Sequence, residues 1–233
     1  MHWSINAASL HLLEKHPSVR VSLMATGNYF EDAVERLKAS GFDACGVHLT
    51  MNSEFQKLPT SPLTRAKSLC DPRGYFLGRT QETRMRAVRA DIRNECVAQI
   101  EAVQNQGLRV THLDSHMFFS DASVWGDSDL GEDIARLASQ LGVPFRRLDR
   151  DNIIFVWESH QDFESRAAFY DECFSKFGGG NTEVILHPAL DEASVCSFTQ
   201  SGPRRVADYR YFLGSQWLEL CAQNNVCLTP RGF

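Results

Sequence analysis

The chain has 233 residues, 43% of them hydrophobic and 23% charged, which is enough for one sizeable core in a single domain spanning residues 1–233. Its formal net charge of -5 and the lack of any ~20-residue apolar stretch exclude nucleic acid and membrane as expected partners. The seven cysteines contain no Cys-x-x-Cys pair, which excludes a zinc ribbon or a disulfide framework and is typical of a reduced, cytoplasmic protein.

Apolar β-branched runs alternate with amphipathic stretches along the chain. In order, the pattern predicts a helix over 3–16, a strand over 19–24, a helix over 29–40, a strand over 44–50, a helix over 80–106, a strand over 108–114, a helix over 128–141, strands over 143–148 and 152–157, a helix over 161–176, a strand over 182–187 and a helix over 203–223. This alternation predicts an α/β fold with a parallel sheet and helices packed outside it.

Three other segments fall between the predicted elements. The irregular stretches 51–79 and 188–202 are long enough that we expect functional loops. The glycine run at 178–180 is not followed by Lys-Ser or Lys-Thr, so it predicts a turn or hinge rather than a phosphate-binding loop.

Ionisable residues gather where the predicted strands end. His48 ends the second strand, Asp114 and His116 end the third, and His187 ends the last, directly before Pro188. Catalytic and ligand-binding residues of parallel α/β folds lie at the carboxyl ends of strands, so we expect a functional site there.

The stretch VTHLDSHMFF, residues 110–119, carries His112, Asp114 and His116 at alternate positions, which point the same way in an extended chain. Imidazole and carboxylate are the ligands that a zinc-like ion prefers, and a catalytic ion takes about three of them. His48 and His116 are therefore candidate metal ligands. Asp114 is expected to bind the metal, to orient an imidazole or to cap the next turn, and His112 to be a packed, hydrogen-bonded histidine.

Two residues near the C-terminus complete the candidates. His187 suits a general acid, because the unperturbed pKa of histidine, near ~6.5, allows both protonation states near neutrality. Arg205, in GPRRVADYR, is expected to hold a neighbouring carboxylate, to clamp a substrate or to remain a solvated residue at a helix start. The lack of a Gly-x-Ser-x-Gly or a Gly-x-Gly-x-x-Gly motif excludes a serine hydrolase and a dinucleotide-binding protein.

Several segments together resemble one family. SLMATG, GVHLTMNSEF, SLCDPRGYF, THLDSHM, GVPFRR, EVILHPALD and RRVADYR are similar in order and spacing to the YdjC-like carbohydrate deacetylases, also called the ChbG/HpnK family. The resemblance implies a distorted (β/α) barrel and a hydrolase that uses a divalent metal ion, Mg or Zn, to remove acetyl groups from N-acetylated sugars. An acetylated carbohydrate is then the expected partner, and a homodimer is an expected assembly.

The resemblance also implies roles for particular residues. His48 and His116 would bind the metal, Asp114 would support His116, and His187 would act in the same pocket. Arg205 and Glu54 would bind substrate.

This sequence departs from the family's pattern at its start. In the family, a strand ending in Asp-Asp-Phe-Gly comes before a helix start that reads SINAAS here, and its aspartates supply a metal ligand and a base. This chain begins MHWSINAAS, so we expect it to lack that strand, and a start site assigned too late is the favoured explanation. The alternatives are a non-catalytic sugar-binding or regulatory relative, or a different metal-dependent hydrolase on the same scaffold.

Overall fold

The computed structural model describes residues 2–126, 128–147, 152–155, 162–177 and 180–229. The chain divides into two compact units, one formed by Met1 and residues 22–150 and the other by residues 2–21 and 151–233. Each unit is described by itself. The expectation of one domain over residues 1–233 stays a prediction.

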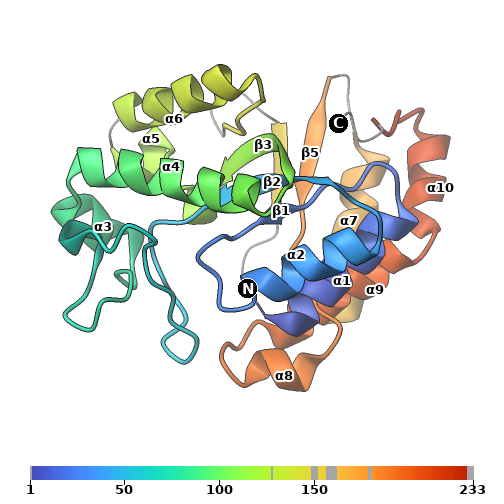
Figure 1. The fold of residues 1–233 in the computed structure, drawn as a ribbon. Coiled ribbons are helices and arrows are strands. Elements are labelled where there is room, and N and C mark those ends of the chain that lie inside the picture. The colour runs from blue at the N-terminus through green and yellow to red at the C-terminus, as the bar shows by residue number, and fades with distance from the viewer. Residues whose placement is uncertain (1, 127, 148–151, 156–161, 178–179, 230–233) are drawn as a thin grey trace. The chain divides into compact units, whose positions relative to one another are not determined.

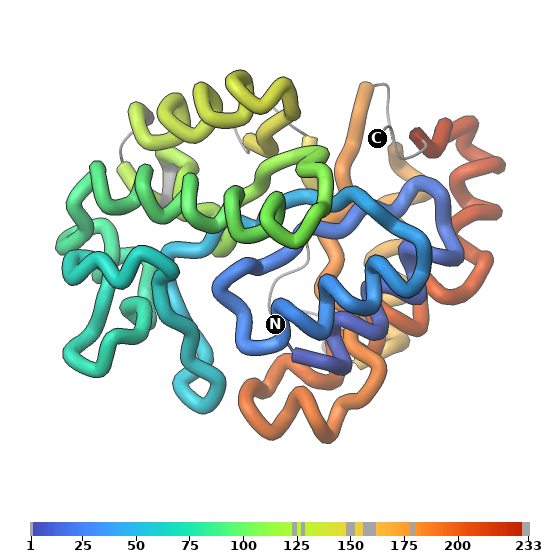
Figure 2. Tube along the Cα trace, viewed as in Figure 1, coloured from blue at the N-terminus to red at the C-terminus, as the bar shows by residue number. Residues whose placement is uncertain are grey.

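The first unit is built on a parallel three-stranded sheet with the order β1-β2-β3 (Figure 1). Its elements are β1 (Ser22–Leu23), α2 (Phe30–Ala39), β2 (Ala44–Leu49), η1 (Lys67–Leu69), α3 (Thr80–Arg86), α4 (Arg89–Asn105), β3 (Arg109–Ser115), η2 (His116–Phe118), α5 (Ala122–Trp125) and α6 (Ser128–Leu141). Beyond β3, Phe145 adds a single parallel bridge to Leu113. Figure 2 shows the long segment after β2 looping outward before the chain enters α3.

Helix α4 covers the two longest strands, because its apolar residues recur at helical spacing. Ile92, Cys96, Ile100 and Val103 are all buried, and the helix packs against β2 and β3. The strand segment ACGVHL is buried at every position except His48, which is partly exposed. The core therefore lies between α4 and the sheet, and it fixes where the strands end.

Gly46 lets the ring of His112 lie against the neighbouring strand. A Cβ atom at position 46 would overlap the His112 ring, whereas one at Gly78 would meet only ordinary van der Waals contact, 3.7 Å from the Ser53 carbonyl oxygen. We expect Gly46→Ala to lower the free energy of unfolding by about 1–3 kcal/mol through overpacking, measured by urea denaturation. Gly78→Ala is the matched control, and a loss that His112→Ala does not partly reverse would contradict this explanation.

The second unit holds a parallel pair of strands, β4 and β5, in the register Asn152 to Thr182 through Phe155 to Ile185. Its elements are α1 (Trp3–Lys15), β4 (Asn152–Phe155), α7 (Phe163–Ser175), β5 (Thr182–Ile185), α8 (Glu192–Cys196), α9 (Gly202–Leu213) and α10 (Gln216–Gln223). Aromatic side chains from α7, α9 and α10 form its core, which is made by Tyr170, Phe174, Tyr211, Phe212 and Trp217.

The predicted α/β fold with parallel strands is confirmed, while the distorted barrel stays a prediction. The helix predicted over 80–106 breaks at Ala87, whose backbone is extended, and the one over 203–223 breaks at Gly214. An amphipathic pattern reports which face is buried and continues across such a break. Residues 143–147 form no strand, only the Phe145 bridge.

The remaining expectations concern an irregular segment, the cysteines and membrane-spanning helices. The segment 188–202 is only partly irregular, because it contains α8. Residues 148, 156, 157, 161, 178 and 179 of the predicted elements lie outside the described residues. All seven cysteines are free. None of the helices that the structure describes has the length and apolar character needed to span a bilayer.

Candidate functional site

The pairing of β2 with β3 brings His48 next to Asp114. The two residues are register partners across the parallel ladder. The Asp114 side chain is fully buried and that of His48 is 19% exposed, and Nδ1 of His48 makes a short contact with Oδ1 of Asp114. His48 is therefore held from behind by a buried carboxylate, and its Nε2 is left to face outward.

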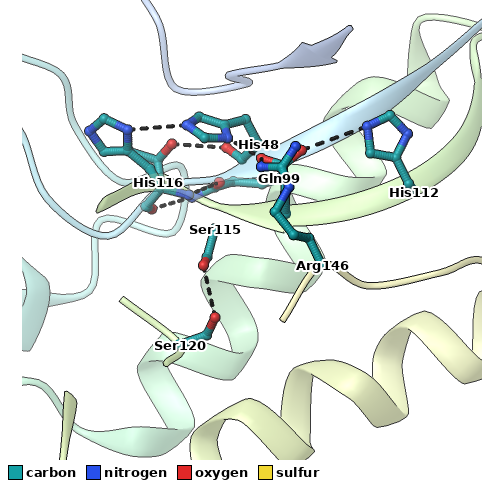
Figure 3. Close-up of polar contacts among 9 residues, drawn as sticks. His48, Gln99, His112, Ser115, His116, Ser120 and Arg146 are labelled. Carbon is teal, nitrogen blue, oxygen red and sulfur yellow. Dashed lines mark hydrogen bonds and ion pairs between the residues drawn. The ribbon is translucent and has the colours of Figure 1, made fainter. Parts of the chain in front are cut away.

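His116 meets that outward nitrogen. Strand β3 ends at Ser115, and the left-handed backbone of Met117 and Phe118, with φ of 52° and 51°, turns the chain sharply after His116. Nε2 of His48 and Nδ1 of His116 are 3.1 Å apart, and the two rings stand edge to face at 74° (Figure 3). The convergence of the two histidines, expected from their places at neighbouring strand ends, is confirmed.

Glu54 completes a chain of four side chains. Its Oε2 lies 2.9 Å from Nε2 of His116, and its side chain is 27% exposed. The order is Asp114, His48, His116, Glu54, so each imidazole has its outer nitrogen on a carboxylate and its inner nitrogen facing the other ring. Glu54, expected to bind substrate, thus lies beside the histidine pair.

This donor set fits two ligands of a divalent metal ion. Two nitrogens bonded to one tetrahedral ion at ~2.0–2.1 Å would lie about 3.3 Å apart, close to the observed 3.1 Å. Ligating histidines usually donate their other ring N–H to a carboxylate or carbonyl, as both could here. Within the residues that the structure describes, no group of three or more His, Cys, Asp or Glu side chains is arranged to hold a metal ion.

Asp114 is kept ionised by the groups around it. Burial alone would raise the pKa of its carboxyl, but His48, Arg146 and His112 outweigh burial and hold that pKa well below its usual range. Nη1 of Arg146 lies 3.7 Å from Oδ1, and Nε2 of His112 lies 3.7 Å from Oδ2 (Figure 3). A permanently charged acceptor behind His48 keeps a proton on Nδ1 and leaves Nε2 free for a ligand.

The expectation that Asp114 supports His116 is wrong, because its partner is His48. Residues two apart on one strand are separated by about 6.6 Å, whereas neighbouring strands lie only about 4.8 Å apart. His116 also lies past the strand end, where the alternation of side chains stops. His112 is partly buried and contacts the Thr111 hydroxyl at 2.9 Å, as expected of a packed, hydrogen-bonded histidine.

Two buried polar residues of α4 that sequence reasoning missed hold the end of β2. Gln99 donates from Nε2 to the carbonyl oxygen of Thr50 at 2.7 Å and accepts from the Thr50 N–H at 2.8 Å. The Thr50 hydroxyl donates in turn to the carbonyl oxygen of His48 at 2.9 Å. Glu95 accepts from Gln99 and from the backbone of Leu63 and Thr64.

Because of these bonds, α4 fixes both His48 and the start of the loop that carries Glu54. The sequence signal that could have identified Glu95 and Gln99 is a pair of polar residues, four apart, on the buried face of an amphipathic helix.

His187 and Arg205 both belong to the second unit. His187 follows β5, and its backbone N–H donates to Asp208 at 3.4 Å. Arg205 is buried, donating from Nε to the Ser201 hydroxyl at 2.8 Å and from Nη1 to the His187 carbonyl oxygen at 3.4 Å. Arg205 is therefore not a solvated residue at a helix start: it braces the strand exit that carries His187.

Comparisons with known proteins identify relatives of this chain. The sequence model of the family described as YdjC-like protein matches residues 1–223. A relative named carbohydrate deacetylase, from Thermoanaerobacter pseudethanolicus, is 24% identical over 219 residues, which are 89% of this chain and 84% of the relative. Another protein of that name, from Enterococcus faecalis, is 31% identical over 183 residues, which are 75% of this chain and 63% of that relative.

A solved structure shows a similar fold. The crystal structure of a candidate cellobiose-phosphate cleavage protein from Enterococcus faecalis has a TM-score of 0.76 to this chain at 20% sequence identity. The match covers 96% of this chain and 92% of that protein.

Proposed function

Since the chain belongs to the YdjC-like family, we propose that it is a carbohydrate deacetylase that hydrolyses the acetamide bond of N-acetylated sugars with the help of a divalent metal ion. The deacetylase activity is inferred from the two relatives, both of which are named carbohydrate deacetylase. The observation that supports a metal ion is the histidine pair. Its inner nitrogens face each other at 3.1 Å, and a carboxylate lies behind each ring.

The residues of the pair would hold the ion through Nε2 of His48 and Nδ1 of His116. A divalent ion bound there lowers the pKa of water and polarises a carbonyl, which an amide, as a poor electrophile, requires. Asp114 and Glu54 keep the ring orientations fixed through the outer nitrogens. The two imidazole nitrogens suit zinc, whereas magnesium prefers oxygen ligands.

Glu54 is placed to do more than orient His116. Its carboxylate is partly exposed and touches a ligand residue, so it can take a proton from water or contact the substrate. The roles of His187 as general acid and of Arg205 in substrate binding rest on the family resemblance, since their surroundings are those of the second unit. A homodimer and a cytoplasmic location stay predictions.

Acetate release tests this function. The purified chain is incubated with N-acetylated chito-oligosaccharides after treatment with a chelator, with and without added magnesium or zinc. We expect acetate only when a divalent ion is present. Equal release with and without chelator would rule out metal dependence, and no release from a panel of acetylated sugars would rule out the deacetylase.

Asp114→Asn isolates the effect of the buried charge behind His48. The amide keeps the shape of the side chain but no longer enforces the protonated Nδ1, so metal affinity should fall by about 10- to 100-fold. Isothermal titration with zinc or magnesium measures the change. Asp133→Asn is the control, because that carboxylate, on α6, pairs with Arg89 at the start of α4; an equal loss in both variants would contradict a specific role for Asp114.

A further inference from the structure

A small pocket opens beside the histidine pair within the first unit. It has an empty volume of about 290 Å³, which includes space open to solvent, and is lined by Met24, Asn52, Glu54, Phe55, Leu58 and Thr60, among others. Glu54 both lines the pocket and contacts His116, so whatever binds in the pocket lies next to the proposed reaction centre.

Asn52 is the unusual residue of this pocket. Its side chain is 1% exposed, yet neither Oδ1 nor Nδ2 has a hydrogen-bond partner among the described residues. The hydroxyl of Thr60, which is 8% exposed, is in the same state. Buried polar groups are rarely left unpaired in native proteins, because each such group loses its hydration without compensation. An amide and a hydroxyl unpaired at one pocket therefore call for a polar ligand.

The hydrogen-bonding pattern of the Asn52 amide restricts the chemical class of that ligand. A primary amide presents a donor and an acceptor side by side, so it pairs in two-pronged fashion with a group that offers the same pattern. Two neighbouring hydroxyls of a sugar ring do so. The acetamide group does not, because its N–H and C=O point in opposite directions across a trans amide bond.

The remaining pocket walls agree with a sugar ring. The hydroxyl of Thr60 can donate to, or accept from, a further ring hydroxyl. Met24, Phe55 and Leu58 offer apolar surface to the C–H groups of the ring. Such a mixture of apolar walls and a few fixed polar groups is what orients a small ligand.

We propose that Asn52 and Thr60 form the subsite that binds the sugar ring of the substrate through neighbouring hydroxyl groups, with Asn52 determining specificity. The identity of the ligand as a substrate rests on the proposed deacetylase function. The binding of a sugar by Asn52 does not depend on turnover, so the two can be tested apart.

The test replaces Asn52 by leucine, which has a similar shape and no polar atoms. Binding of a deacetylated chito-oligosaccharide, which has no acetyl group to release, is followed by titration calorimetry, and stability by urea denaturation. Loss of a two-pronged hydrogen bond should weaken sugar binding by about tenfold or more. Because a buried unpaired amide is removed, stability should stay equal or rise.

Two further variants sharpen the result. Thr60→Val removes only a hydroxyl and should weaken binding less than Asn52→Leu does. Asn105→Leu changes an exposed asparagine at the end of α4 and should leave sugar binding as it is.

The outcomes separate the subsite from the proposed function. Unchanged sugar binding by Asn52→Leu would overturn the subsite, and lower stability of that variant would in addition make Asn52 a structural residue bridged by buried water. The wild-type chain failing to bind any sugar of the panel would overturn it as well. Sugar binding that depends on Asn52, in a chain that releases no acetate, would support the subsite and refute the deacetylase. Acetate release with an unchanged KM in Asn52→Leu would do the reverse.

Discussion

Replacing His116 by alanine should lower acetate release by more than about 100-fold and weaken metal binding at least as strongly. The imidazole of His116 supplies one of the two inner nitrogens that face each other at 3.1 Å. Losing a residue that hydrogen-bonds to a metal ligand costs about 10- to 100-fold in metal affinity or activity. Losing the ligand itself removes a bond to the metal and should therefore cost more. The measurements are steady-state acetate release and a calorimetric titration with zinc or magnesium.

A matched control comes from the other unit. His11 is a histidine on α1 whose ring contacts the Tyr209 hydroxyl at 2.6 Å, and it has no proposed role in the reaction. His11→Ala should keep full metal binding and acetate release. Comparable activity of His116→Ala and the wild-type chain would remove His116 from the site, whereas loss of activity with unchanged metal binding would make it a substrate residue rather than a ligand.

The sequence predicts the place of this site better than its contacts. Strand ends in a parallel α/β fold share an edge, so the positions of His48 and His116 along the chain are enough to predict that they meet. Which side chain Asp114 would contact depends on the strand register, and the register is set by tertiary packing of β2 on β3. The sequence pattern left the partner of Asp114 open, and the family resemblance implied His116, two residues away, which was wrong.

The roles of Gln99 and Asn52 could not be predicted from the sequence for a different reason. Gln99 reads as one more polar residue on an amphipathic helix, and its value as a clamp on Thr50 appears only once α4 is packed against β2. The unpaired state of Asn52 is likewise a property of the folded loop. Local pattern thus predicts elements and their ends, while the polar contacts across elements need the assembled core.

Replacing Asp208 by asparagine should lower the free energy of unfolding by about 3–5 kcal/mol, the usual cost of breaking a buried ion pair from one side. Asp208 is 1% exposed and Arg166 is 2% exposed, and the two are bound through a short contact to Oδ1 and a second bond of 3.3 Å to Oδ2. The Tyr170 hydroxyl donates to the same carboxylate at 2.8 Å. The variant leaves the guanidinium buried without its counter-charge, and urea denaturation followed by circular dichroism measures the loss.

The double variant Arg166→Met with Asp208→Leu distinguishes stability from a role at the site. With both charges removed, apolar side chains fill the space and most of the lost stability should return. The bond from the backbone N–H of His187 to the side chain at position 208, however, is lost in the double variant, because leucine has no acceptor. If His187 serves as the general acid, acetate release should stay low in the double variant while stability recovers. Recovery of both together would show that Asp208 matters only for folding and that Arg205 alone is enough to brace the exit of β5.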